Sequence, residues 1–596
     1  MNKKFLLFPA LLAAALTTVS AQNYTPVEQM SEAQVPFEAD PAWSKVSSAR
    51  FAWGSIDNRY DKHAVPALKA GAKAVQTAWR GEKVNFQAVV WTPDALQDAA
   101  IAVSDLKCGR NIISAENVKA GFERYVMGDC LGVKGTKGYF EESEGGIAGY
   151  DKRDSVLVAD AIIGLSMPEI EARTVRPVWV SVSIPQSAAA GTYRGSITFS
   201  SKSLKKELKL QYSVVVKDRV LPKPALWKFH LDIWQSPFAI ARYYGVTPWS
   251  SEHLELMRPY MERLAAAGEK VVTATLMHDC WGPQTLDPFA TMVQVTKNID
   301  GTFDFNYDIF DLWVDFMASC GITEQINCFT IAPWQMNFRY YDRATDSMQS
   351  LHFADYADEN YRTIWLPLLK DFSAHLRQKG WFDKTYLAVD ERGLDIMLKV
   401  IALAREADPQ YKFALAGLYH PEIMGDLSDF SMDMASEEPF MADGREQINS
   451  NRRSEGKITT FYICCGEPHP NTYTFSPLAE STALGWYALA ANYDGMLRWA
   501  FNSWNAEPLF DGRWYNLSSG DIFMVYPQNC SSVRWERFVE GIQDFEKVQI
   551  LREEYASRPD KLAALEAAIA AFKRDTLLEG NAAGLVSAAK AAINKF

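Results

Sequence analysis

Two acidic residues stand side by side at the end of an apolar run in the segment KTYLAVDERG, residues 384–393. Asp390 and Glu391 directly follow YLAV, a run typical of a buried strand. Neighbouring carboxylates repel each other and burial disfavours their charged forms, so we expect the pKa of at least one to be raised. A carboxyl group that keeps its proton near neutral pH can act as a general acid.

Cleavage of a glycosidic bond requires such a group, because one carboxyl must protonate the leaving oxygen. In one scheme Glu391 is the acid/base and Glu467, in ITTFYICCGEP, is a nucleophile ~5–5.5 Å away. In a second scheme a 2-acetamido group of the sugar attacks its own anomeric carbon. Asp390 then holds the acetamide N–H, and Glu391 serves first as acid and then as base. If the acidic pair is not catalytic, it is a strand end neutralised by a salt bridge, with Arg392 as the partner.

The fold that positions these residues is predicted from the hydrophobic pattern. From Trp227 onward, short apolar runs alternate with longer amphipathic stretches. Eight βα units indicate a (β/α)8 TIM-like barrel, in which the active site gathers at the C-terminal ends of the strands. The predicted strands are residues 227–233, 271–275, 325–329, 385–389, 412–416, 430–433, 459–463 and 495–499, and the predicted helices include 305–319, 357–379, 394–407 and 478–491.

Three further regions accompany the barrel, which we assign to residues 225–535. Residues 1–21 have the basic start, apolar stretch and small residues of a signal peptide, so we expect an exported protein, periplasmic or secreted. Residues 22–222 show the period-two alternation of half-buried strands and predict an N-terminal β-sandwich domain. Residues 536–596 are alanine-rich and predict a C-terminal helical region that packs on the core.

The composition argues against several classes of function. The 596 residues carry a net charge of −12 and no basic tract, so nucleic acid is not an expected partner. After the signal, no apolar run is long enough to span a bilayer. The sequence has no HExxH, no glycine-rich phosphate loop and no GxSxG motif, and we expect neither a metal nor an organic cofactor. Eight cysteines without a CxxC pair do not indicate a disulfide scaffold.

Five segments resemble glycoside hydrolase family 123, in the family's order. They are HLDIWQSPFAIARYY (230–244), YLAVDERG (386–393), FYICCGEPHPN (461–471), YDGMLRWAFNSWNAEPLFD (493–511) and SVRWERFVEGIQDFEKVQIL (532–551). The resemblance implies an exo-acting β-N-acetylgalactosaminidase with a substrate-assisted, retaining mechanism. Asp390 would then orient the acetamide and Glu391 would be the acid/base. The implied substrate is a glycan with a terminal β-linked N-acetylhexosamine: a glycolipid, a glycosaminoglycan or a mucin-type glycan.

Side chains near the predicted strand ends are candidates for holding a sugar, because pyranose faces are apolar and favour aromatic platforms. We expect Tyr419 to donate to the acetamide oxygen, His278 and His420 to bind hydroxyl groups, and Arg498 to pair with a barrel carboxylate instead of ligand. A barrel that binds glycan without cleaving it remains the alternative of a different class. The full set of substrate-binding candidates is Trp234, His278, Trp281, Trp334, Tyr419, His420, Glu467, Trp499, Asn502 and Trp504.

Overall fold

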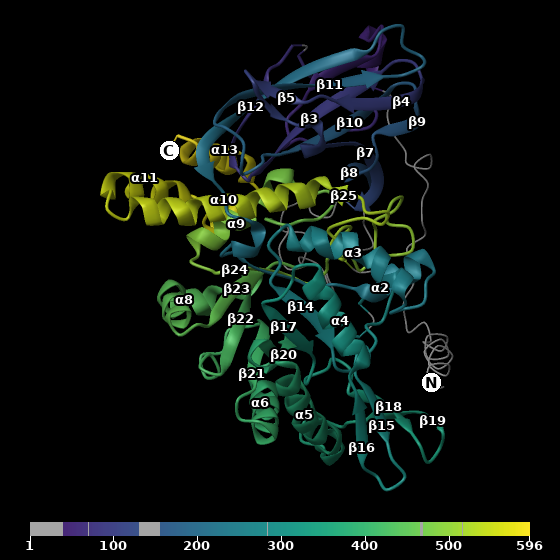
Figure 1. Ribbon diagram of the computed structural model, residues 1–596, viewed down its shortest axis with the longest axis vertical. Helices are drawn as coiled ribbons and strands as arrows, with labels where there is room; N and C mark the ends of the chain where they lie inside the picture. The colour runs from purple at the N-terminus through teal and green to yellow at the C-terminus, as the bar shows by residue number, and fades with distance from the viewer. Residues whose placement is uncertain are drawn as a thin grey trace.

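The computed structural model of the protein describes residues 40–69, 71–129, 155–282, 284–464, 469–514 and 517–595. The signal-like segment 1–21 and Glu467 lie outside these ranges. Figure 1 shows a β-sandwich at the top, a barrel below it, and C-terminal helices in yellow that run between the two. The fold class predicted from the sequence is confirmed.

The N-terminal domain consists of two sheets. One has the strand order β1-β3-β10-β7-β8-β25 and the other β2-β12-β11-β4-β9, with β5 paired to β11 and β6 to β5. Alternate residues such as Val84, Phe86 and Ala88 enter the core between the sheets. The strands are β1 (Arg50–Trp53), β2 (Ala74–Arg80), β3 (Lys83–Thr92), β4 (Leu96–Val103), β5 (Leu106–Cys108), β6 (Asn111–Ile113), β7 (Val118–Asp129), β8 (Ser155–Ile162), β9 (Ser166–Ile170), β10 (Thr174–Ser183), β11 (Gly191–Ser200), β12 (Leu208–Val220) and β25 (Ser531–Ser532).

Eight parallel strands form the barrel, in the order β13-β24-β23-β22-β21-β20-β17-β14. All eight predicted strands are confirmed, and most of their residues are buried, as expected of parallel strands covered on both faces. Between β13 and β14 the ring is closed by an isolated bridge from Leu231 to Glu269. The strands are β13 (His230–Ile233), β14 (Val271–Thr275), β17 (Gln325–Phe329), β20 (Thr385–Asp390), β21 (Lys412–Gly417), β22 (Leu427–Asp433), β23 (Ile458–Tyr462) and β24 (Gly495–Arg498).

Helices connect most of the barrel strands, and the four predicted ones are confirmed. The fifth unit has no helix, because residues 418–426, all of them described, form only turns and irregular backbone between β21 and β22. In the described ranges no helix is both long and apolar enough to cross a membrane. The helices are α2 (Pro237–Tyr244), α3 (Ser251–Ala265), α4 (Asp308–Ser319), α5 (Glu359–Lys379), α6 (Leu394–Ala407), α7 (Glu438–Ala442), α8 (Arg445–Ser454) and α9 (Leu478–Ala490).

A small four-stranded sheet interrupts the second and third units of the barrel. Its order is β16-β15-β18-β19, and it extends beyond α4 and α5 at the bottom of Figure 1. The sequence analysis did not predict these strands, which are short and lie within long βα connections. They are β15 (Gln294–Lys297), β16 (Phe303–Asn306), β18 (Asn337–Asp342) and β19 (Ser347–His352).

Helix α10 (Val533–Tyr555) joins the sandwich to the barrel. On the sandwich side Glu540 accepts a hydrogen bond from Asn85 at 2.6 Å, and Lys547 pairs with Glu82 at 3.0 Å. On the barrel side α10 packs against α9 so closely that a Cβ at Gly541 would lie 2.4 Å from the Thr482 carbonyl oxygen. Helices α11 (Pro559–Ile569), α12 (Arg574–Leu578) and α13 (Ala582–Ile593) follow.

We expect Gly541→Ala to lower the free energy of unfolding by about 1–3 kcal/mol, because the added methyl overlaps the backbone of α9. Alanine is the better helix former, so any loss arises from the contact. Thermal and urea denaturation measure the effect. Gly425→Ala is the matched control, since a Cβ there meets nothing within 4 Å. Equal stability of the two variants would contradict the close α9–α10 contact.

Candidate active site

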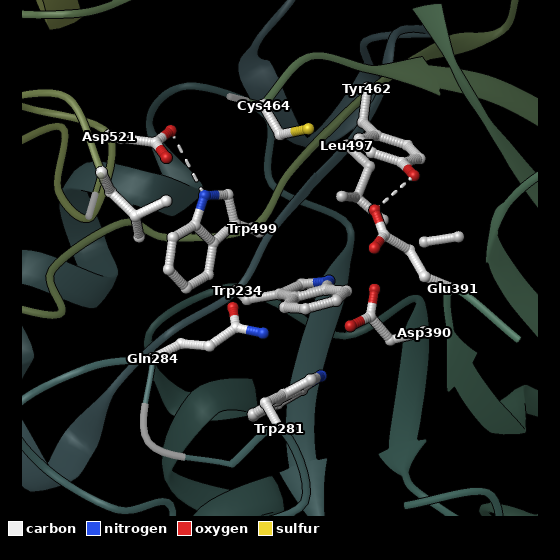
Figure 2. A pocket seen from close by; sticks show the side chains of 12 residues that line it. Trp234, Trp281, Gln284, Asp390, Glu391, Tyr462, Cys464, Leu497, Trp499 and Asp521 are labelled. Atoms are coloured by element: carbon white, nitrogen blue, oxygen red, sulfur yellow. Dashed lines mark hydrogen bonds between the residues drawn. The ribbon is translucent and has the colours of Figure 1, made fainter. Parts of the chain in front are cut away.

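A cavity of about 260 Å³ opens at the C-terminal ends of the barrel strands. Of the residues proposed from the sequence, five line it: Trp234, Trp281, Asp390, Glu391 and Trp499. In Figure 2 the two carboxyl groups lie on one side of the cavity, with Trp234 in the middle and Trp499 on the opposite side. The structure therefore brings the acidic pair and three of the predicted aromatic side chains together.

The backbone at Glu391 explains how two adjacent carboxyl groups reach the same cavity. Along a regular strand, neighbouring side chains point to opposite faces. Asp390 is the last residue of β20, and Glu391 has a left-handed conformation with φ of 48°. Its N–H donates to the Ala416 carbonyl oxygen of β21 at 2.7 Å. The turn ends the alternation, so both side chains line the cavity. A left-handed residue other than glycine costs about 1–2 kcal/mol.

The environment of Asp390 favours its protonated form. Burial, together with the negative charge of Glu391, raises the pKa of Asp390 to about 7. The indole N–H of Trp334 donates to Oδ2 of Asp390 at 3.0 Å and acts in the opposite direction, because it stabilises the carboxylate. At neutral pH the protonated form of Asp390 is therefore well populated.

Glu391 is more accessible to solvent than Asp390. Partial burial raises the pKa of Glu391, while a hydrogen bond from the Tyr462 hydroxyl lowers it. That hydroxyl lies 2.8 Å from Oε1 of Glu391. Burial, with the charge of Glu391, keeps the pKa of Tyr462 well above its usual value, so Tyr462 remains a donor. Glu391 thus combines access to solvent with a fixed hydrogen bond.

If the acidic pair were only a salt-bridged strand end, Arg392 would pair with one of its carboxylates, and it does not. Its guanidinium stacks over the Trp334 ring at 4.0 Å and donates to the carbonyl oxygens of Ala332 and Glu391, each at 3.3 Å. Among the ion pairs of the described residues, none joins Arg392 to a carboxylate of the acidic pair. Arg392 instead stacks on Trp334, and the indole N–H of Trp334 donates to Asp390.

An aromatic wall forms one side of the cavity. Trp234 follows β13 and stacks on Trp281, with ring centroids 4.9 Å apart and an interplanar angle of 23°. Both rings also contact Phe329 at the end of β17, at 4.6 and 4.9 Å. Packed rings of this kind present a rigid apolar surface, which suits the apolar face of a pyranose.

The other sequence candidates that the structure describes do not line the cavity. Trp334 contacts it only through Asp390. Asn502 binds the backbone of Ser236 with both its amide atoms, at 2.8 and 3.0 Å, and fixes the start of α2. Trp504 is fully buried and donates to the Val525 carbonyl. The cavity also excludes His278, Tyr419 and His420, and Glu467 lies outside the described residues.

Tyr419 and His278 have other contacts or neighbours outside the cavity lining. Tyr419 stacks on Phe440 at 4.6 Å, and its hydroxyl donates to Asp443 at 3.1 Å. Burial, with the nearby positive charge of Arg339, lowers the pKa of His278 to about 4. In the structure the tyrosine beside the acidic pair is Tyr462 rather than Tyr419.

Seven further residues line the cavity that the sequence analysis did not propose: Gln284, Ala416, Tyr462, Cys464, Leu497, Leu517 and Asp521. Tyr462 had a usable signal, since it lies at the end of the predicted seventh strand. Gln284, Leu517 and Asp521 come from long connections without periodicity. The prediction that Arg498 pairs with a carboxylate is confirmed: it lies 2.8 Å from Asp521.

A barrel cavity with paired carboxyl groups and an aromatic wall is the arrangement expected of a glycoside hydrolase. Comparison with family models agrees. Residues 234–551 match the model described as Glycoside hydrolase 123, catalytic domain, and residues 53–201 match the Glycoside hydrolase 123 N-terminal domain. The chain belongs to glycoside hydrolase family 123.

Among solved structures, the chain is similar to a family 123 glycoside hydrolase from Clostridium perfringens, described in terms of glycolipid glycan hydrolysis. The identity is 25%, the TM-score is 0.81, and the match covers 92% of this chain and 99% of that chain. A GH20 exo-β-N-acetylglucosaminidase from Vibrio harveyi is 9% identical over 70% of this chain and 82% of its own, but its TM-score of 0.19 carries no argument. Comparison with curated proteins finds no match.

The raised pKa of Asp390 predicts a pH-dependent effect of Asp390→Asn on stability. The folded state favours protonated Asp390 up to pH of about 7, whereas the unfolded chain ionises near its ordinary value of 3.8. This contribution to stability is therefore complete below pH ~4 and is lost as the pH rises through 7. Asparagine resembles the protonated form, so the variant should gain on the order of 1–3 kcal/mol relative to wild type between pH 5 and 8.

Denaturant unfolding of both proteins across this pH range measures the difference. Asp408→Asn is the control. Burial raises the pKa of Asp408, but the hydrogen bonds from Arg377 and the Gln410 N–H, together with the charge of Arg377, outweigh burial and leave the pKa below its usual value. The control should therefore lose stability by a constant amount between pH 5 and 8. A constant difference for Asp390→Asn as well would contradict the raised pKa.

Proposed function

We propose that the protein is an exported, exo-acting β-N-acetylgalactosaminidase that retains the anomeric configuration by a substrate-assisted mechanism. The observation that carries the proposal is that Asp390 and Glu391, adjacent in sequence, both line one cavity. The similar C. perfringens enzyme, described in terms of glycolipid glycan hydrolysis, supports a glycan with a terminal β-linked N-acetylhexosamine as substrate. The signal-like residues 1–21 support export.

The size of the cavity supports exo action. Its volume of about 260 Å³ lies below the ~300–1,000 Å³ of sites for drug-sized ligands. Such a cavity suits a single sugar residue at the end of a glycan. The stacked Trp234 and Trp281 would bind the apolar face of that sugar, and the acidic pair would lie beside its anomeric carbon.

In the first half of the reaction, protonated Glu391 donates its proton to the glycosidic oxygen as the bond from that oxygen to C1 breaks. The acetamide carbonyl oxygen forms a bond to C1 from the opposite face, and the leaving group departs as an alcohol. The product is an oxazolinium ion. The carboxylate of Asp390 accepts the acetamide N–H and stabilises the positive charge that develops on this group.

In the second half, the carboxylate of Glu391 removes a proton from water. The water oxygen bonds to C1 from the face that the alcohol left, and the bond from C1 to the acetamide oxygen breaks. Two inversions give net retention. Glu391 is protonated again, and the acetamide and Asp390 return to their starting states.

The mechanism requires the proton of the acidic pair to lie on Glu391 when substrate is bound. In the free protein the pKa of both carboxyl groups is raised, and that of Asp390 reaches about 7. An acetamide N–H beside Asp390 favours the ionised form of that carboxyl, because it donates to it. Binding of substrate therefore shifts the proton toward Glu391, which is the more exposed of the two and faces the leaving group.

We expect the protein to hydrolyse p-nitrophenyl β-N-acetylgalactosaminide, and a galactose-configured thiazoline that mimics the oxazolinium ion to inhibit it. Release of p-nitrophenol measures both. Glu391→Gln should lower kcat/KM by about 10²–10⁴-fold, as expected for loss of a general acid. Hydrolysis only of an aryl glycoside that lacks the acetamide would contradict the assisted mechanism and favour Glu467 as a nucleophile.

The hydrogen bond from Tyr462 predicts the pH profile of a Tyr462→Phe variant. Removal of the hydroxyl withdraws a donor from ionised Glu391, so the pKa of Glu391 should rise. Since Glu391 must be protonated to act, the alkaline limb of kcat/KM should move upward by about one pH unit. The control is Tyr411→Phe, which removes a buried hydroxyl that donates to the Leu369 carbonyl. An unchanged alkaline limb in Tyr462→Phe would contradict this role.

A further inference from the structure

Asp521 is a buried carboxylate at the end of the cavity remote from the acidic pair. It lines the cavity and has no measurable solvent exposure. Figure 2 shows Asp521 and Trp499 across the cavity from Asp390 and Glu391. A sugar with its anomeric carbon at the acidic pair therefore directs its hydroxyl-bearing carbons toward Asp521.

The two oxygens of Asp521 have different surroundings. Oδ1 accepts hydrogen bonds from Arg498 at 2.8 Å and from the indole N–H of Trp499 at 3.3 Å. Oδ2 is buried and has no hydrogen-bond partner among the residues that the structure describes. A buried carboxylate oxygen without a donor is costly, and most such atoms in proteins are satisfied. The free oxygen is therefore prepared to accept a hydrogen bond from a ligand.

The backbone around Asp521 is held in place from two sides. Arg498 also donates to the Asp521 carbonyl at 2.7 Å. Arg534 of α10 donates to the carbonyl oxygens of Gly520 and Phe523, each at 3.1 Å. Gly520 has a φ of 85°, and a Cβ there would lie 2.8 Å from the Thr474 backbone nitrogen. Asp521 is thus a fixed group and not a mobile surface side chain.

The charges of the cavity all have the same sign. Among its described lining residues the charged ones are Asp390, Glu391 and Asp521, and none is a lysine, arginine or histidine. A neutral hydroxyl can donate to the free oxygen of Asp521, whereas a sulfate or carboxylate on the sugar would be repelled at short range.

We propose that Asp521 determines specificity by accepting a hydrogen bond from a free hydroxyl on the terminal sugar, and that it excludes sulfated or otherwise anionic hexosamines. The inference rests on the proposed hydrolysis of a terminal hexosamine and narrows its substrate class to neutral, unsubstituted residues. A sulfated glycan would have to undergo sulfate-ester hydrolysis before this enzyme could act on it.

The test compares wild type with Asp521→Ala and Asp521→Asn on an aryl β-N-acetylhexosaminide, its 3-, 4- and 6-deoxy forms and its 4- and 6-sulfates. For wild type, we expect one deoxy form to lose about 10–100-fold in kcat/KM. Asp521→Ala should lose a similar factor on the parent sugar and hydrolyse the parent and that deoxy form equally. Wild type should disfavour the sulfates by at least 100-fold, and Asp521→Asn should reduce that factor.

Asp408→Asn is the matched control, because Asp408 is also a buried aspartate with an arginine partner, outside the cavity. It should leave all the substrate ratios unchanged. Thermal denaturation establishes that each variant is folded. If the Asp521 variants do not fold, the wild-type ratios alone decide: equal hydrolysis of parent and sulfates, or of parent and all deoxy forms, overturns the inference.

The inference and the proposed function fail in different ways. If wild type hydrolyses a glucosaminide but no galactosaminide, the proposed sugar is wrong, and the same deoxy and sulfate comparisons in the gluco series still test Asp521. If no aryl glycoside is hydrolysed, binding of the free sugars is followed by tryptophan fluorescence. Equal affinity for the sugar and its 6-sulfate and 4-sulfate would then overturn the inference.

Discussion

The hydrogen bond from the Glu391 N–H to the Ala416 carbonyl is the interaction on which the site depends. A regular strand end would leave one carboxyl in the cavity and send the other into the barrel wall. The left-handed residue avoids this, and the bond to β21 holds it there. The mutual repulsion of the two carboxyl groups follows from this geometry. Burial at this position raises the pKa of both carboxyl groups, and the charge of Glu391 adds to the rise for Asp390, so the strained backbone and the chemistry have the same origin.

The sandwich contributes to the site through buried charges rather than through the cavity wall. Asp160 of β8 is fully buried and accepts hydrogen bonds from Arg534 at 2.9 and 3.1 Å and from the Tyr526 hydroxyl at 2.7 Å. Arg534 in turn holds the carbonyl oxygens around Gly520, which precedes Asp521. A carboxylate of the N-terminal domain thus orients the arginine that fixes a cavity loop. This makes the sandwich a structural support of the active site.

Elements that are marked by a short hydrophobic pattern in the sequence could be predicted from it. Buried parallel strands such as 385–389 and 412–416 are mainly apolar runs, TYLAV and KFALA, and their positions follow from the sequence pattern. The acidic pair was identified because it directly follows such a run. The closure of the barrel by an isolated bridge and the small sheet of β15, β16, β18 and β19 depend on contacts between segments that no periodicity marks.

The cavity residues near strand ends could be predicted from the sequence, and those on long connections could not. Trp234, Trp281 and Trp499 were found because each lies close to a strand end. Asn502 and Trp504 satisfied the same rule, but they turn away and hold the Ser236 and Val525 backbones. Position in sequence gives the rim of the barrel and not the direction of a side chain. Asp521 could not be found, because it reaches the cavity through a long connection after β24.

The charge distribution of the cavity is also a property of the assembled structure. Arg498 binds one carboxylate oxygen of Asp521 and leaves the other without a partner among the described residues. Arg392 stacks on Trp334 and leaves the acidic pair without an ion pair among the described residues. Both arginines hold carboxylate-bearing segments in place while the cavity itself keeps an excess of negative charge. In the proposed mechanism that excess favours the oxazolinium ion, because fixed carboxylates stabilise a developing positive charge.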